Sequence, residues 1–497
     1  MSRAAVLALD QGTTGSAALV IGADGAVLAR AYSEFTQHFP RPGRVEHDAE
    51  EIWRVTARVA GEAVAAARTE VAAVGVTNQR ETVVVWDPET LRPLHRAIVW
   101  QDRRTAALCR ELKEAGHEGM IRRRTGLLLD PYFSGTKLRW IFDRHPELEA
   151  RARAGELAVG TIDSWLVARM TGGAVHATDP TNASRTLLFD LDDGDWNDEL
   201  LGLLGVPRRV LPEVRSSSGD FGITDGAAFG LEAPIGGIAG DQQAALYGQG
   251  CWEAGVGKCT YGTGAFLLLN TGGRRVSSAH GLLTTAACDA RGGRAYALEG
   301  SIFVAGAAVQ WLRDGLGLLD DAAGSEAMAR SLDGNDGVYL VPAFVGLGAP
   351  HWRPDARGSI TGLTRGTTRA HLVRAALEAM AYGTRDVVAA MERDAGIRAR
   401  SLRADGGAAR NDWLMEFTAG VLGIPVRRPD MVETTALGAA GLAGLAAGVW
   451  ADPESFATAF GAGRTFAPSL GGDEREALIR GWNRAVRGTL ATLEAEQ

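Results

Sequence analysis

Two short loops rich in glycine and threonine constrain this chain more than any other feature, because each joins two apolar strands. The first lies in "LALDQGTTGSAALV" (7–20), and the second lies in "TYGTGAFLLLN" (260–270), in the other half of the chain. Glycine lets such a loop turn tightly and approach a ligand, while threonine offers hydroxyl and N–H groups to phosphate oxygens. Either loop alone could equally be an ordinary hairpin turn. Together they predict a duplicated nucleotide-binding fold of the α/β class.

Length and composition set the broad class of the protein. The chain has 497 residues, of which 46% are hydrophobic and 23% charged, which is enough for two or more domains with their own cores. A net charge of −8 with dispersed Lys and Arg argues against a nucleic-acid partner. No cleavable signal is expected, because the segment after Met1 runs directly into a strand. No CxxC pair or histidine-flanked spacing occurs among the cysteines, so we expect reduced thiols in a cytoplasmic protein: Cys109, Cys251, Cys259 and Cys288.

One uncharged run, "TTALGAAGLAGLAAGVWA" (434–451), is near the lower length limit for a membrane helix. Its Ala and Gly residues contribute little to membrane insertion. We therefore expect no membrane span here, but a buried helix that packs closely against a ligand or another helix.

Polar residues stand where several apolar strands end. The segment "TNQRE" (77–81) separates two β-rich stretches, and Asp241 stands between an apolar strand and an Ala-rich helix in "IAGDQQAALYGQG" (238–250). Further on, "LRADGGAARNDW" (402–413) reads as strand, glycine turn and helix, an arrangement in which a helix N-terminus faces an anion or a nucleotide. Taken alone, Asp241 is also explained as the N-cap of the helix that follows it.

An ordered set of motifs runs along nearly the whole chain. It comprises "LDQGTT", "GVTNQRET", "AIVWQDRR", "DPYFSGTKLRW", "TNASRT", "GIAGDQQAAL", "TYGTG", "ALEGSIFVAGAAVQWLRD", "GLGAPHW", "GLTRGTT" and "DGGAARNDWLMEF". In these motifs the chain resembles the glycerol kinases of the FGGY carbohydrate kinase family, within the actin-like ATPase superfold. Both signature patterns of the family are matched, by "YFSGTKLRW" (132–140) and "GSITGLTRGTTRAHLVRAALE" (358–378). The resemblance implies two actin-like (ribonuclease H-like) domains, residues 1–248 and 249–497, that close over a cleft.

The resemblance also implies a reaction, the transfer of the γ-phosphoryl group of ATP to glycerol with Asp241 as the general base. Such a transfer mainly needs reactants held in place, phosphate charge neutralised and a base for the hydroxyl proton. The implied glycerol pocket combines hydrogen-bonding groups with aromatic rings that cover a small triol. Its residues are Arg80, Glu81, Trp100, Tyr132, Asp241, Gln242 and Phe266. For the aromatic residues among them, core packing is the ordinary alternative.

The nucleotide side is implied in the same way. Asp10 resembles the carboxylate associated with Mg²⁺, and it is the second residue for which a catalytic role is expected. The implied phosphate ligands are Thr13, Thr14, Gly15, Thr263, Gly306 and Gln310, and the implied adenosine ligands are Gly407 and Asn411. For Gly306 and Gln310, helix packing is the alternative without the family context.

The first loop departs from the family pattern at two positions. Gly15 and Ala17 stand where resembling enzymes have serine and arginine, so the polyphosphate loses one hydroxyl and one guanidinium. Arg410 and Arg365 are the candidates to compensate from the second domain. Two other functions stay open from the sequence: a kinase for another small polyol or sugar, and a non-catalytic actin-like nucleotide-binding sensor. A homo-oligomer, either a dimer or a tetramer, is also expected.

Overall fold

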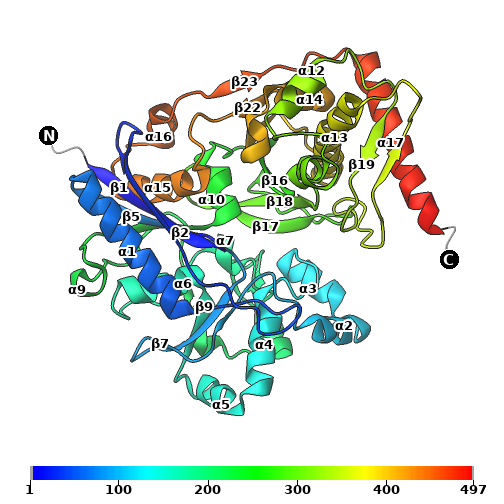
Figure 1. Cartoon of the computed structure of the whole chain (residues 1–497). Helices are drawn as coiled ribbons and strands as arrows, with labels where there is room; N and C mark the ends of the chain where they lie inside the picture. The colour runs from blue at the N-terminus through cyan, green and yellow to red at the C-terminus, as the bar shows by residue number, and fades with distance from the viewer. Residues whose placement is uncertain (1–3, 495–497) are drawn as a thin grey trace.

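The structure is a computed structural model that describes residues 4–494. Two lobes are stacked in Figure 1, and a mixed β-sheet organises each half of the chain. The N-terminal sheet has the strand order β14-β5-β1-β2-β3. Its strands are β1 (Ala5–Gln11), β2 (Gly15–Gly22), β3 (Val27–Glu34), β5 (Val71–Asn78) and β14 (Ile235–Gly240).

The first loop closes the hairpin between β1 and β2, as the glycine and threonine pattern predicts. β1 pairs antiparallel with β2 and parallel with β5, and β2 pairs antiparallel with β3. Helix α1 (Ala49–Ala67) covers one face, and the carboxylate of Asp48 caps it by accepting hydrogen bonds from the N–H groups of Glu50 and Glu51. The buried residues of α1 recur at helical spacing, among them Ile52, Val55, Val59 and Ala63.

The C-terminal sheet repeats this arrangement. Its order is β17-β18-β16-β15-β21-β22-β23, with β15 antiparallel to β16 and parallel to β21. The pairing β1–β2 beside β5 thus has a counterpart in β15–β16 beside β21, and the second glycine loop joins β15 to β16. The strands are β15 (Val256–Tyr261), β16 (Ala265–Gly272), β17 (Leu283–Cys288), β18 (Arg294–Ile302), β21 (Ser401–Asp405), β22 (Val426–Arg428) and β23 (Arg464–Phe466). The expected duplicated α/β fold is confirmed.

Helix α15 (Thr434–Ala446) comes from the second half of the sequence but packs on the N-terminal sheet (Figure 1). The contact is close because both surfaces are glycine and alanine. A Cβ on Gly75 of β5 would lie 2.2 Å from the carbonyl oxygen of Ala439. On its other side α15 packs as closely on α10 (Asp241–Gly248), where a Cβ on Gly438 would lie 1.9 Å from the carbonyl oxygen of Ala244. The run expected to be a closely packed helix is one, and within the described residues no helix is long and apolar enough to cross a membrane.

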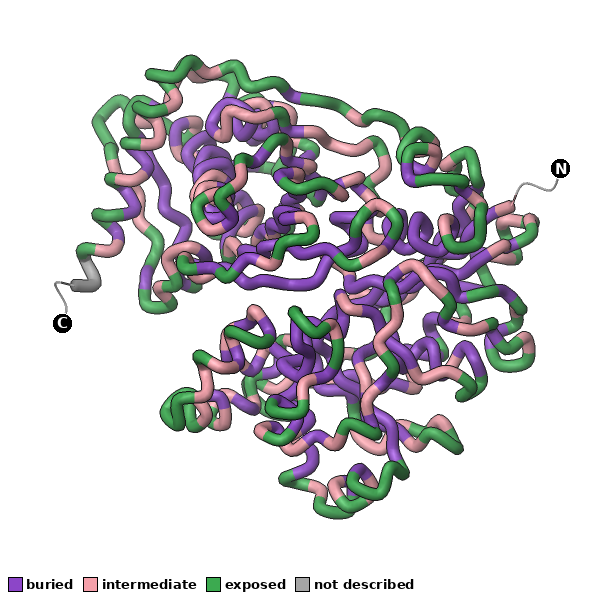
Figure 2. The backbone as a smooth tube through the Cα atoms, turned by 180° about the vertical axis from the view of Figure 1, so that it is seen from behind, coloured by how far each residue is buried: buried purple, intermediate pink, exposed green. Residues whose placement is uncertain are grey.

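The remaining elements cover the sheets or form the lower part of the first lobe. In Figure 2 the buried segments are concentrated in the strands and in the helices packed on them. The helices on the second sheet and on the elements around it include α10 (Asp241–Gly248), α11 (Gly306–Gln310), α12 (Gly324–Arg330), α13 (Arg369–Ala395), α14 (Asp412–Leu422) and α17 (Gly472–Glu494). The lower part holds β4 (Glu46–His47), β6 (Val83–Asp87), β7 (Arg92–Pro93), β8 (Ala97–Ile98), β9 (Ala158–Thr161), α2 (Ala106–Glu114), α3 (Glu118–Thr125), α4 (Ser134–Arg144), α5 (Pro146–Ala154), α6 (Ile162–Met170), α7 (Pro180–Ala183) and α8 (Asp198–Leu204).

Candidate active site

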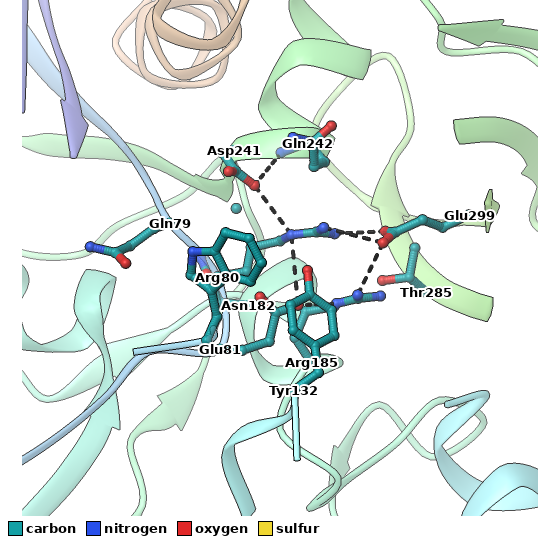
Figure 3. Close-up of polar contacts among 12 residues, drawn as sticks. Gln79, Arg80, Glu81, Tyr132, Asn182, Arg185, Asp241, Gln242, Thr285 and Glu299 are labelled. Atoms are coloured by element: carbon teal, nitrogen blue, oxygen red, sulfur yellow. Dashed lines mark hydrogen bonds and ion pairs between the residues drawn. The ribbon is translucent and has the colours of Figure 1, made fainter. Parts of the chain in front are cut away.

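A cluster of charged side chains forms the centre of the candidate active site (Figure 3). Arg80 and Glu81 follow β5, and Asp241 is the first residue of α10, directly after β14. Because β5 and β14 are parallel neighbours, their carboxyl ends bring these residues to one edge of the sheet. Arg80 Nε lies 3.2 Å from Asp241 Oδ1. Three of the expected site residues are therefore together.

The two oxygens of the Asp241 carboxylate differ in their surroundings. Oδ1 contacts Arg80 and also accepts a hydrogen bond from the N–H of Gln242 at 2.7 Å. Oδ2 accepts no hydrogen bond from any described residue, and the side chain is 34% exposed. The N-cap position of α10 is Gly240, so capping does not account for the placement of this carboxylate. One oxygen is anchored while the other is free for a substrate hydroxyl.

Behind this edge, four buried side chains form a network of ion pairs. Arg80 donates to both oxygens of Glu299, at 2.7 and 3.2 Å, and Arg185 donates to Glu299 at 3.1 Å and to Glu81 at 2.7 Å. None of the four side chains is more than 2% exposed. Burial alone would raise the pKa of the Glu299 carboxyl, but Arg185 and Arg80 lower it to about 2. Each carboxylate of the network is thus paired with a guanidinium.

The backbone at Glu81 is in the left-handed region, with φ at 63°. A residue with a side chain rarely adopts this conformation, which costs about 1 kcal/mol or more and persists only where neighbours enforce it. Arg185 binds the Glu81 carboxylate, and the hydroxyl of Ser134 binds the Glu81 carbonyl at 3.0 Å. The strained turn is therefore held from both ends.

Three buried charges of the site lie outside the set expected from the sequence: Arg185, Glu299 and Lys258. Arg185 lies in "TNASRT" and Glu299 in "ALEGS", so both motifs were recognised while their charged residues were not singled out. A glutamate among the small and apolar residues 295–300 of β18 was the available signal, since a buried charge is rarely left unpaired. Nothing in the sequence indicates its partner.

Two of the expected aromatic residues form one wall of the site. Trp100 and Tyr132 contact each other edge to face, with ring centroids 5.5 Å apart, and both are half-buried. Trp100 Nε1 donates a hydrogen bond to Thr13 Oγ1 at 2.9 Å. This bond joins the expected glycerol pocket to the first glycine loop, so the two sites are physically continuous.

Gln242 is connected to the second sheet through Lys258. The fully buried ammonium group of Lys258 donates to Gln242 Oε1 and, at 2.9 Å, to Thr260 Oγ1. Burial lowers the pKa of Lys258, while Asp405 and Asp241 oppose that shift. Phe266 is half-buried on β16 directly opposite Thr260, but no ring contact joins it to the Trp100–Tyr132 wall in the described part of the chain.

Asp10 is the penultimate residue of β1, beside the first loop. Its carboxylate accepts no hydrogen bond from a described residue, and burial together with the neighbouring Asp241 raises its pKa to about 7. A cation beside Asp10 would relieve the repulsion between its carboxylate and that of Asp241, and could at the same time bind phosphate. Mg²⁺ suits such a place, because it binds through one or two carboxylates together with phosphate oxygens and water. The donor set at Asp10 therefore fits Mg²⁺, although within residues 4–494 no group of three or more His, Cys, Asp or Glu could hold a metal ion.

Five of the expected nucleotide residues line one cavity of about 560 Å³ in the second lobe, while Thr13, Thr14 and Gly15 lie in the first loop. Its floor is the second glycine loop, where a Cβ on Gly306 would lie 2.6 Å from the Gly262 carbonyl oxygen. Asn411 caps α14 by accepting from the N–H of Leu414 at 2.9 Å. Of the two candidate compensating arginines, Arg410 lines this cavity, and Arg365 is exposed elsewhere. The expected residues in the lining are Thr263, Gly306, Gln310, Gly407 and Asn411.

Comparison with known proteins agrees with this geometry. The N-terminal domain of the FGGY family of carbohydrate kinases matches residues 5–248, and the C-terminal domain of that family matches residues 257–447. The chain is 56% identical to a glycerol kinase of Dechloromonas aromatica, over 98% of this chain and 97% of that protein. It is 57% identical to a glycerol kinase of Alkalilimnicola ehrlichii, over 97% and 98%. The crystal structure of Plasmodium falciparum glycerol kinase with ADP superimposes with a TM-score of 0.94 at 35% identity, covering 98% of both chains.

Proposed function

This chain belongs to the FGGY family of carbohydrate kinases, and on that premise we propose that Asp241 is the general base with which it transfers the γ-phosphoryl group of ATP to a terminal hydroxyl of glycerol. The activity is that of a glycerol kinase, the name carried by relatives 56% and 57% identical over nearly the whole chain. The product is sn-glycerol 3-phosphate.

The observation that carries the mechanism is the half-anchored Asp241 carboxylate. Arg80 and the N–H of Gln242 hold Oδ1, which leaves Oδ2 to accept the proton of a glycerol hydroxyl. The exposed edge of this carboxylate faces the site, so a substrate oxygen can reach it. The oxygen that loses its proton then becomes the nucleophile for the γ-phosphorus.

Glycerol has three hydroxyls, and the pocket supplies matching groups. Arg80 donates and Glu81 accepts (Figure 3). The wall of Trp100 and Tyr132 covers the carbon chain and excludes water from the reacting atoms. Gln242 adds an amide that Lys258 holds in place. A compact pocket of this kind favours a three-carbon polyol over a longer sugar.

On the nucleotide side, we assign the adenosine to the cavity lined by Gly407 and Asn411 and the phosphates to the two glycine loops. Mg²⁺ at Asp10, when bound, would neutralise phosphate charge. Thr13 and Thr14 would offer hydroxyl and N–H groups to the phosphate oxygens. Closure of the lobes would keep water from the γ-phosphate.

Three further statements belong to the proposal. The domain boundary at residue 248 is supported by the family matches on either side of it. A cytoplasmic location is supported by four cysteines that are all buried and unpaired. A homo-oligomer is proposed from the family resemblance alone, and light scattering on the purified protein would measure it.

A coupled ADP-release assay, run with and without glycerol, tests the function. Glycerol-dependent ADP release is expected, and a panel with xylulose, gluconate and ribitol separates this activity from that of a kinase for a longer polyol or sugar. ADP binding without release on any of these substrates would favour the non-catalytic nucleotide sensor.

A further inference from the structure

Three residues form one row across the first three strands. Asp10 on β1 is directly opposite Ala17 on β2, and Ala17 is directly opposite Tyr32 on β3. Residues directly opposite each other in antiparallel strands point to the same face of the sheet. Tyr32 therefore shares a face with Asp10, and only the small side chain of Ala17 stands between them.

Helix α15 covers this face of the sheet on the side away from the first glycine loop. The row of Asp10, Ala17 and Tyr32 lies past the N-terminal end of that helix. Val6, Ala8 and Leu19 are buried in the same cluster as Leu437 and Ala440 of α15. Arg30, two residues before Tyr32, forms an ion pair at 3.7 Å with Glu433, which immediately precedes α15. Tyr32 is thus the next residue on this face toward the first glycine loop, and it is 52% exposed.

The side chain of Tyr32 extends over Gly15. A Cβ built on Gly15 would lie 2.7 Å from the Tyr32 hydroxyl oxygen and 2.8 Å from the ring carbon that carries it. It would also lie 2.6 Å from the carbonyl oxygen of Ser33, so no side chain fits at position 15. The tyrosine hydroxyl occupies the space in which a serine side chain at this position would begin.

The hydroxyl is available as a donor. It makes no hydrogen bond to any other residue within 4–494. Partial burial and the neighbouring Glu34 raise the pKa of Tyr32, while Arg30 opposes the shift, so the group keeps its proton at neutral pH. Glu34 lies opposite Gly15 on the same face of the sheet and adds negative charge there. This charge favours the neutral, protonated form of the Tyr32 hydroxyl over the tyrosinate anion.

We propose that the Tyr32 hydroxyl donates a hydrogen bond to a phosphate oxygen of the bound nucleotide, and that β3 thereby supplies a ligand which Gly15 and Ala17 do not. The inference rests on the proposed function only in placing phosphate beside Asp10 and the first loop. Glycine at position 15 leaves room for this placement of the tyrosine, because a Cβ there would meet both the Ser33 carbonyl oxygen and the Tyr32 hydroxyl.

The test is Tyr32→Phe, which keeps the ring over Gly15 and removes only the hydroxyl. Titration calorimetry of the full chain with ADP, in the absence of glycerol, measures phosphate-side binding, and adenosine serves as the second probe. The dissociation constant for ADP is expected to rise roughly tenfold, as for the loss of a hydrogen bond to a charged group, with that for adenosine unchanged. The matched control is Tyr296→Phe, which removes a buried hydroxyl bound to the Leu191 carbonyl at 2.9 Å and should leave ADP affinity unaltered.

An ADP dissociation constant in Tyr32→Phe within twofold of the wild type would overturn the proposal and leave Tyr32 as a cover for Gly15. An equal loss for ADP and adenosine would also overturn it, because the effect would not be specific to phosphate. Glycerol-dependent ADP release by the wild type is measured separately. Wild-type protein that binds ADP but does not phosphorylate glycerol would refute the proposed function without deciding the role of Tyr32.

Discussion

Glu299 and Arg80 form a two-bond ion pair, at 2.7 and 3.2 Å, between residues 219 positions apart in the sequence. Glu299 lies on a strand of the second sheet, and Arg80 follows a strand of the first. The remaining guanidinium nitrogen, Nε, is the one that contacts Asp241. Glu299, from the second half of the chain, therefore fixes the orientation of the Arg80 guanidinium toward Asp241 and the substrate.

Glu299→Gln should raise the KM for glycerol and lower kcat/KM for glycerol by roughly 10- to 100-fold. A glutamine accepts through one oxygen only, so Arg80 loses one bond and can turn toward Asp241. The chain should still fold, because two guanidinium groups would then face the carboxylates of Glu81 and Asp241. Steady-state kinetics with each substrate varied in turn, together with a thermal melt, measure these effects.

Glu378→Gln is the matched control for that variant. Glu378 is also a buried glutamate of the second lobe paired with an arginine, Arg374, at 2.8 Å, but it lies outside the charged cluster. The Glu378→Gln variant should be less stable than the wild type, and its KM for glycerol should be unchanged. If both variants lose stability and neither changes the glycerol KM, Glu299 has a structural role only.

Asp241→Asn should keep the fold and most of the substrate affinity, since the amide has the same shape as the carboxylate. The proton acceptor is lost, so kcat should fall by on the order of 10² to 10⁴. Binding of ADP and glycerol by calorimetry would confirm that the site is intact. A variant with nearly normal kcat would remove Asp241 from the mechanism.

Much of the local structure follows from sequence pattern. The hairpin around Thr13 and Thr14 and the strand-to-helix junction at Asp241 are both confirmed. Each depends on neighbours within a few residues: apolar alternation, a cap or a glycine turn. The placement of Gly407 and Asn411 in one cavity with Thr263 also agrees with the family motifs.

What the sequence did not predict depends on contacts between distant segments. The bond between Trp100 and Thr13 spans 87 positions, and the packing of α15 on the first sheet joins the two halves of the chain. The position of Tyr32 over Gly15 depends on the register of β2 against β3, which no single strand pattern specifies. Tertiary geometry supplied each of these relationships.

Trp100 offers a way to separate ring packing from hydrogen bonding. Trp100→Ala should raise the glycerol KM by roughly tenfold, because the ring that faces Tyr132 and covers the substrate is lost. Trp100→Phe keeps an aromatic ring but cannot donate to Thr13, so it should affect the KM for ATP more than that for glycerol. A large drop in melting temperature with both KM values unchanged would make Trp100 a packing residue.

Ala17→Arg should lower the KM for ATP severalfold at little cost in kcat. The side chain would project from the row of Asp10 and Tyr32, where a guanidinium can reach phosphate. If the Tyr32 hydroxyl already binds phosphate, the gain should be larger in a Tyr32→Phe background than in the wild type. Equal gains in both backgrounds would show that the two positions act independently.

His47 should make the protein less stable as the pH falls from about 6.5 to 4. The ring is fully buried against Phe35, and its Nε2 is 2.8 Å from the amide oxygen of Gln37. Burial, together with His38, lowers the pKa of His47 from 6.5 to about 4, so the folded protein keeps it neutral over this interval. The unfolded chain binds a proton there instead, so the free energy of unfolding decreases with falling pH and is lower by up to about 3 kcal/mol at pH 4.

The variant His47→Gln removes this titration. Urea unfolding at several pH values should show that its free energy of unfolding depends less on pH than that of the wild type between pH 6.5 and 4. Parallel curves for the two proteins would mean that other groups account for the acid sensitivity.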